Sequence, residues 1–205
     1  MITNTPYAAT DADQAAVANV LTEAFLDDPL ARWLFPEAGE RARLQPHFYR
    51  LQLAHPAAEA YLIGDRDGVS LWHNLTAGHA AHEEAPQPPA SGPVFGASAV
   101  RLRALGEALA PRHPDVPHLY LSCMGVIGGR QGSGLGSAML RHRLERADAD
   151  GLGVYLEASS PRSRALYLRH GFEDLGEPVR VADSPPLWPM WRHPENRQDK
   201  GSEHR

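Results

Sequence analysis

Residues 118–149 read HLYLSCMGVIGGRQGSGLGSAMLRHRLERADA. The run over residues 118–126 is compact and apolar, as is typical of a buried strand, and residues 134–149 repeat apolar side chains at helical spacing. Three alternating glycines, Gly132, Gly134 and Gly136, lie between these two patterns. This order predicts a strand that passes through a glycine-rich turn into the start of a helix.

Such a turn can hold a phosphate or pyrophosphate, because glycine permits close backbone approach and the first amides of a helix have no partners. A tight turn that binds nothing is the alternative. Leu135 and Gly136 follow Gly134 where a Walker A loop needs Lys and then Ser or Thr, so a P-loop is excluded. Ser137 stands where a dinucleotide fingerprint places its third glycine, which disfavours that motif as well.

The remaining pattern, Gln-x-x-Gly-x-Gly at Gln131, Gly134 and Gly136, resembles the signature of the GNAT superfamily of N-acetyltransferases. Upstream, residues 121–126 resemble the bulged strand of that family, whose exposed amides pair with pantetheine. Downstream, residues 165–172 resemble its second signature, in which Leu-Tyr is followed by three residues and Gly-Phe. Two ordered motifs at a suitable separation favour a ligand-binding turn over a bare one.

A closer resemblance, to puromycin N-acetyltransferase and its relatives, rests on four shorter phrases. These phrases are residues 69–72, 109–113, 134–138 and 156–162. The likeness extends over most of residues 10–193, is strong from residue 118 to 172 and is loose before residue 69. The resemblance therefore says more about the acyl donor than about the acceptor.

The resemblance implies an α/β (α+β) fold with a central, mostly antiparallel mixed sheet, splayed around an acyl-CoA cleft and covered by helices on both faces. We expect one such domain over residues 1–193 and a disordered, charged tail over residues 194–205. The chain pattern agrees with this order of elements. It predicts helices over residues 11–25, 37–54 (interrupted or offset at Pro46), 94–110 and 161–170, a hairpin of residues 59–64 and 69–75, an exposed loop over residues 77–92, a strand over residues 154–157, and an antiparallel pair near residues 179–182 and 187–191.

Two local signals in the first half support these boundaries. Asp28-Pro29 is expected to end the first helix. The hairpin turn, residues 65–68, is polar and contains Gly68, the residue type that a left-handed position favours.

The resemblance implies acetyl-CoA as the acyl-donor cosubstrate, held mainly through backbone groups. The amides around Gly125 would bind pantetheine and polarise the thioester oxygen, and the glycine turn would hold the pyrophosphate. The expected donor-binding residues are Met124, Gly125, Val126, Gln131, Gly132, Ser133, Gly134, Leu135, Gly136, Ser137 and Ser160. Ser160 stands where many members of the superfamily have Asn, and a hydroxyl replaces only part of an amide's hydrogen bonding.

Two side chains are candidates for the proton transfers. Tyr167 matches the family position that lies near the CoA sulfur, and a phenol with a pKa of about 10 is protonated at neutral pH. Glu157 is the candidate base for an ammonium substrate, directly or through water. Aromatic packing for Tyr167 and a solvent-facing or salt-bridged carboxylate for Glu157 are the structural alternatives.

Other conspicuous residues have simpler explanations. Cys123 invites an acyl-cysteine mechanism, but a cysteine within a buried strand is more often a packing residue. His79, His82, His113 and His118 suggest zinc, the pair His79 and His82 above all, but no third ligand is evident beside that pair in its Pro-rich stretch, so no metal is expected. Aromatic residues of the N-terminal half, Trp33, Phe35, Phe48 and Tyr49, either line an acceptor pocket or pack the core.

Composition narrows the function further. The net charge of −5 and the absence of a basic run disfavour a nucleic-acid partner. No signal peptide or long apolar segment is evident and there is a single cysteine, which predicts a cytoplasmic protein without a membrane partner.

The sequence therefore predicts acetyl transfer to the amine of a small molecule, an antibiotic or similar metabolite, by direct attack in a ternary complex. Acetylation of a protein lysine or N-terminus is the first alternative, and a non-catalytic acyl-CoA sensor is the second. Either a monomer or a homodimer is compatible with the sequence.

Overall fold

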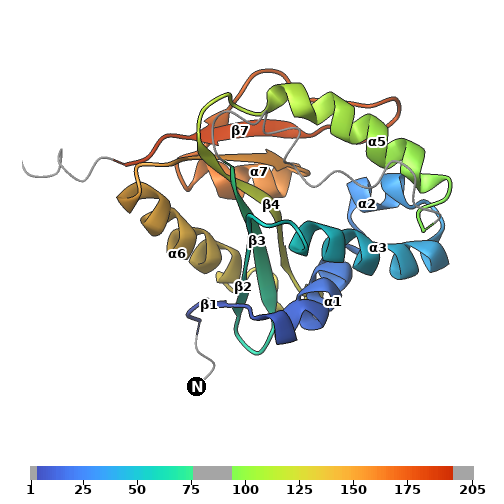
Figure 1. Cartoon of the computed structure of the whole chain (residues 1–205), viewed down its shortest axis with the longest axis horizontal. Coiled ribbons are helices and arrows are strands. Elements are labelled where there is room, and N and C mark those ends of the chain that lie inside the picture. The colour runs from blue at the N-terminus through green and yellow to red at the C-terminus, as the bar shows by residue number, and fades with distance from the viewer. Residues whose placement is uncertain (1–3, 76–93, 196–205) are drawn as a thin grey trace, which may run out of the picture.

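The computed structural model describes residues 4–75 and 94–195 of the chain, and a seven-stranded sheet runs through them (Figure 1). The strands are β1 (Tyr7–Ala8), β2 (Ala58–Ile63), β3 (Gly68–Leu75), β4 (His118–Val126), β5 (Gly153–Ala158), β6 (Glu173–Asp174) and β7 (Trp188–Arg192). Their order across the sheet is β1-β2-β3-β4-β5-β7-β6. Only β4 and β5 pair in parallel, and the other neighbours are antiparallel. The mixed, mostly antiparallel sheet is thus confirmed.

Helices cover both faces of this sheet (Figure 1). They are α1 (Gln14–Phe25), α2 (Pro29–Leu34), α3 (Ala38–Leu53), α5 (Ser98–Leu109), α6 (Leu135–Ala149) and α7 (Pro161–Leu168), with short 3-10 helices at Asp11–Asp13, Ala110–Arg112 and Gly128–Arg130. Side chains alternate between the two faces of a strand. On β2, Tyr61 therefore packs against His142 of α6, while Leu62 joins the core beneath α1.

The first helix is confirmed and ends before Asp28-Pro29, but α2 was not expected and the expected interruption at Pro46 was wrong. Pro29 does not only follow α1: it begins α2, because Asp28 caps that helix by accepting from the amides of Leu30 and Ala31 at 2.9 and 3.2 Å. Pro46 does not interrupt α3, which runs continuously through it. Ala42, whose carbonyl loses its helical donor at Pro46, is an exposed residue, so water can replace that donor.

The hairpin is confirmed as β2 and β3, with Ile63 paired to Gly68. The left-handed glycine of its turn is Gly64, with φ of 66°, and not Gly68 as the turn pattern had suggested. Helix α5 begins at Ser98, four residues later than expected from residue 94. The predicted loop over residues 77–92 lies outside the described residues.

At the far edge of the sheet, the expected antiparallel pair is only partly formed. Val179 and Leu187 make a single bridge, and β7 pairs instead with β5 and with the short β6. The apolar pattern could not show β6, because both of its residues, Glu173 and Asp174, are exposed and acidic. Within residues 4–75 and 94–195, no helix has the length and apolar character needed to cross a bilayer.

Gly153, at the start of β5, is expected to be intolerant of a side chain. A Cβ at this position would overlap the indole ring of Trp191 in β7, so Gly153→Ala should destabilise the protein by roughly 1–3 kcal/mol. Gly39→Ala is the matched control, because a Cβ there has no neighbour within 4 Å. Urea unfolding measures both, and equal midpoints for the two variants would contradict this packing.

Candidate active site

The strands β4 and β5 separate halfway along their length. They pair only from His118 with Gly153 to Leu121 with Leu156. Beyond that point β4 keeps only β3 beside it, while β5 keeps only β7. An irregularity opposite Leu71 and Trp72 leaves Ser122 as an extra residue in β4, and such a bulge bends a strand. The two central strands therefore splay apart, as the resemblance to the GNAT superfamily implied.

The free edge of β4 presents backbone donors to this opening. Ile127 donates its N–H to the Asp67 carbonyl at 3.0 Å, toward β3. Since the N–H groups of a strand alternate in direction, those of Met124 and Val126 point away from β3. Met124, Gly125 and Val126 all line a cavity of about 940 Å³ that fills the opening. An extended ligand with regularly spaced acceptors could pair with this edge as a further strand would.

The glycine turn lies at one end of the same cavity. Gly132 and Gly134 have φ of 81° and 86°, and α6 begins immediately after them at Leu135. Among the described residues, no backbone carbonyl accepts a hydrogen bond from the N–H groups of residues 132–137. Free amides at the start of a long helix favour the binding of an anion. The space beside the turn is open, because a Cβ at Gly132 or Gly134 would meet no atom within 4 Å.

Gln131 connects the end of β4 to α7. Its Nε2 donates to the Val126 carbonyl at 3.2 Å, and its Oε1 accepts from Arg162 at 3.0 Å. Ser133 donates to the Arg130 carbonyl, so its hydroxyl is already engaged within the turn. Arg130 and Arg162 also line the cavity near the glycine turn; Arg130 pairs with Asp67 at 3.2 Å, whereas Arg162 bonds the neutral Gln131 and adds positive charge there. Neither arginine was predicted as a site residue.

The conformation of Gly134 makes it a sharp test of the anion site. Gly134→Ala places a Cβ in the left-handed region, at a cost of about 1–2 kcal/mol, so the turn should relax and the affinity for CoA should fall roughly tenfold. Ser133→Ala is the matched control, because its hydroxyl contacts only the turn itself, and should change affinity less than twofold. Calorimetric titration with CoA measures both, and equal affinities for the two variants would contradict an anion site here.

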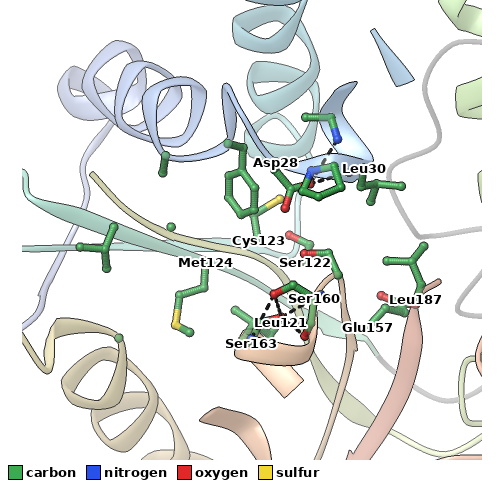
Figure 2. Close-up of a pocket in the computed structure, with 18 of the residues that line it drawn as sticks. Asp28, Leu30, Leu121, Ser122, Cys123, Met124, Glu157, Ser160, Ser163 and Leu187 are labelled. Atoms are coloured by element: carbon green, nitrogen blue, oxygen red, sulfur yellow. Dashed lines mark hydrogen bonds between the residues drawn. The ribbon is translucent and has the colours of Figure 1, made fainter. Parts of the chain in front are cut away.

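Helix α7 presents Tyr167 to the cavity. Ser160 and Ser163 form the capping box that starts this helix, with the Ser160 hydroxyl accepting from the Ser163 amide at 3.1 Å (Figure 2). Tyr167 is buried, lies edge-on to Phe172 at a centroid distance of 5.8 Å, and lines the cavity. Burial raises the pKa of the Tyr167 phenol, so the hydroxyl stays protonated and can donate. Ser160 lines the cavity too, although its hydroxyl is engaged in capping.

Glu157 projects from the end of β5 into the cavity, with only 6% of its side chain exposed (Figure 2). The Tyr120 hydroxyl donates to its Oε2 at 2.9 Å, and His113 Nε2 lies 3.7 Å from its Oε1. Burial raises the pKa of the Glu157 carboxyl to about 7, against the lowering effect of the hydrogen bond from Tyr120. A carboxyl with such a pKa can accept and release a proton near neutral pH. The solvent-facing alternative for Glu157 does not fit this burial.

The positions of Tyr120 and His113 beside Glu157 could not be predicted from the sequence. The Tyr120 and Tyr155 rings lie 5.9 Å apart because their strands pair in parallel register, and the His113 ring is 4.6 Å from that of Tyr155. His113 follows α5, far from both strands in sequence. The alternation of Tyr155 and Glu157 on one strand was the available signal, but nothing local places Tyr120 or His113 beside it.

The remaining conspicuous residues divide between the cavity and the core. Phe35, Phe48 and Tyr49 line the cavity, whereas Trp33 hydrogen-bonds Asp183 at 2.8 Å and does not. Burial raises the pKa of the Cys123 thiol to about 12, which disfavours an acyl-cysteine. Across the described part of the chain, no group of three or more His, Cys, Asp or Glu side chains could hold a metal, and His79 and His82 lie outside it.

Comparisons with known proteins agree with this geometry. The model of a family described as Acetyltransferase (GNAT) family matches residues 28–172. Among solved structures, the chain is similar to one described as histone acetyltransferase HPA2 and related acetyltransferase from Corynebacterium glutamicum, with 28% identity and a TM-score of 0.69 over 94% of this chain and 97% of that one.

Two further solved structures share the fold at lower identity. Arylalkylamine N-acetyltransferase 2 from Aedes aegypti has 17% identity and a TM-score of 0.67, over 93% of this chain and 98% of that one. The ribosomal-protein-S18-alanine N-acetyltransferase from Escherichia coli has 14% identity and a TM-score of 0.56, over 98% of both chains.

Proposed function

This chain belongs to the GNAT family of acetyltransferases, and we propose that it transfers the acetyl group of acetyl-CoA to the amino group of a small molecule. The observation on which the proposal rests is Glu157, a buried carboxyl with a pKa of about 7 in the cavity that also contains Tyr167. A group that titrates near neutral pH can take the proton that an ammonium must lose before it attacks. The family uses acetyl-CoA as its acyl donor.

The residues along the opening fit acetyl-CoA. The free N–H groups of Met124 and Val126 suit the amides of pantetheine, and the unpaired amides of residues 132–137 suit a pyrophosphate. Arg162 supplies positive charge at the same end, where Arg130 is paired with Asp67. We assign the donor to this half of the cavity, which Gly125 and Gly136 also line.

The proposed chemistry uses Glu157 and Tyr167 as base and acid. When bound, acetyl-CoA supplies an acetyl thioester, whose C–S bond breaks as the amine lone pair forms the C–N bond. Glu157 first accepts one proton from the ammonium, and Tyr167 gives its phenolic proton to the departing sulfur. The second nitrogen proton returns to Tyr167, and Glu157 releases its proton to solvent. Each turnover thus yields one acetamide, one free thiol and one proton.

The acceptor we propose is a small metabolite amine, and an antibiotic amine of the puromycin type is the narrower proposal. The phrases shared with puromycin N-acetyltransferase support it, as does the fold shared with an enzyme for arylalkylamines. The fold shared with an enzyme for a ribosomal-protein alanine keeps a protein amine as the alternative. With its single cysteine, such an enzyme fits the cytoplasm, as a monomer or a homodimer.

Thiol release from acetyl-CoA, with mass spectrometry of the acetylated product, tests this proposal. Puromycin and simple primary amines would be compared with peptides that contain a lysine or a free N-terminus. We expect the small amines to be acetylated at least tenfold more efficiently than the peptides. Preference for a peptide would establish the protein-acetylating alternative, and tight CoA binding without turnover on any amine would indicate a sensor.

A further inference from the structure

The cavity extends beyond the free edge of β4 into a region whose walls come from α2, α3 and α5. Apolar side chains make up most of this region, which we call the acceptor chamber: Leu30, Leu34, Phe35, Phe48, Leu102 and Leu105. Leu34, Phe35, Leu102 and Leu105 are buried. The chamber therefore suits an apolar body, because a polar group there would lose water without gaining a partner.

Hydrogen-bond acceptors are concentrated where the chamber meets the strand opening. Gln45 is 1% exposed, and its Oε1 has no hydrogen-bond partner among the described residues, because its Nε2 already donates to the Phe25 carbonyl at 3.3 Å. Glu157 Oε1 has no partner at hydrogen-bond distance in the described part of the chain, although His113 Nε2 lies 3.7 Å away and Tyr155 is close enough to lower the pKa of Glu157. Buried acceptors in this state call for a ligand that donates hydrogen bonds.

Asp28 adds a second carboxylate to this part of the cavity (Figure 2). Both capping bonds to α2 use its Oδ1. Burial raises the pKa of the Asp28 carboxyl, although hydrogen bonds from Ala31, Leu30 and Ser159 act to lower it. Burial raises the pKa of the Cys123 thiol, a hydrogen bond with Ser122 acts to lower it, and the charges of Glu157 and Asp28 both raise it, so both carboxylates lie near Cys123 (Figure 2).

Positive charge is placed elsewhere in the cavity. Its lining arginines are Arg130, Arg162 and Arg169, all from the glycine turn and α7. The described lining residues between 23 and 110 include no arginine or lysine, and His113 is the titratable base beside Glu157. The lining also includes Glu23 and Asp27, of which Asp27 pairs with Arg32 at 2.6 Å. Arg41 is not a lining residue, and its guanidinium donates to the Phe35 carbonyl at 2.8 Å. An anionic group on the acceptor would therefore meet carboxylates and, among the described residues, no lining arginine or lysine in this half of the cavity.

From this arrangement we infer that the acceptor is a monocationic amine on an apolar body, whose ammonium binds between Asp28 and Glu157 and whose apolar part fills the acceptor chamber. This inference rests on the proposed function. A second ammonium at the far end would lose its hydration among leucine side chains, and a carboxylate would be repelled at the near end.

Three acceptors of equal chain length test the inference: hexylamine, 1,6-diaminohexane and 6-aminohexanoate. We expect kcat/KM for hexylamine to exceed that for each of the others by at least 30-fold. Equal values would overturn the inference while leaving the acetyltransferase function intact. If none is acetylated, calorimetric titration of the CoA-bound protein still decides it: selective binding of hexylamine supports the chamber, and equal or absent binding overturns it.

Asp28→Asn is the sharpest variant, because Asn caps a helix as well as Asp does but has no charge. We expect KM for hexylamine to rise about tenfold, with kcat within threefold and KM for acetyl-CoA unchanged. Asp150→Asn is the control, since Asp150 is half exposed at the end of α6 and pairs only with Arg146 at 3.9 Å. Thermal unfolding checks that both variants fold. An unchanged KM for hexylamine in a folded Asp28→Asn protein would overturn the role of Asp28.

Discussion

Glu157→Gln is expected to lower kcat by about 100-fold, because an amide cannot take the proton that the ammonium must lose. Gln can still accept the hydrogen bond that the Tyr120 hydroxyl donates to Glu157 Oε2, so the packing around it should be retained. Binding of acetyl-CoA should change less than twofold. Steady-state thiol release with hexylamine measures the effect.

The same variant has a predicted effect on stability with a definite sign. Because burial raises the folded-state pKa of Glu157 to about 7, the folded protein binds this proton more tightly than the unfolded chain does. The contribution of the protonated Glu157 carboxyl to the free energy of unfolding is fully present below the unfolded pKa of about 4.3. This contribution is lost as pH rises through the folded-state pKa of about 7. The amide has no charge to bury, so Glu157→Gln should unfold at a higher temperature than the wild type at pH 8.

Glu145→Gln is the control for both effects, since Glu145 is an exposed residue of α6 outside the cavity. It should leave kcat and the unfolding temperature at pH 8 unchanged. If Glu157→Gln keeps the wild-type kcat, Glu157 is not the base. If Glu157→Gln unfolds at a lower temperature than the wild type at pH 8, burial of the Glu157 carboxyl does not destabilise its charged form.

Tyr167→Phe is expected to lower kcat by about 30- to 100-fold, because the thiolate would then leave without an acid beside it. The phenylalanine ring can keep the edge-on contact with Phe172, so the fold and the affinity for acetyl-CoA should be preserved. Single-turnover rates and calorimetric titration with acetyl-CoA separate the two quantities.

Tyr7→Phe provides the comparison, because the side chain of Tyr7 is exposed on the edge strand β1. It should have no effect on either quantity. If the rate of Tyr167→Phe equals that of the wild type, Tyr167 packs the helix and another group protonates the sulfur.

The donor half of the site could be predicted from the sequence because its signals are local. The strand over residues 118–126 was predicted with the bounds of β4, and the following helix within one residue of α6. The glycine turn lies directly between them, so its position relative to the helix start follows from chain continuity. Most of the contacts that we expect between the glycine turn and the acyl donor are made by backbone amides. The geometry of these amides depends little on distant residues.

The acceptor half could not be predicted, because its polar groups come from segments far apart in the chain. Asp28 precedes α2, Gln45 lies within α3 and Glu157 ends β5. Only tertiary packing brings them to one cavity. Asp28-Pro29 was interpreted as a helix end, which is equally the pattern of a helix start, so the capping role of Asp28 and its place in the cavity were both missed.

The pH dependence of kcat/KM for hexylamine, at saturating acetyl-CoA, tests the central claim most directly. We predict that the wild-type value rises with pH through an apparent pKa near 7, as Glu157 ionises, and that this ionisation disappears in Glu157→Gln. A wild-type profile with no ionisation near pH 7, or a Glu157→Gln profile that retains it, would contradict the account.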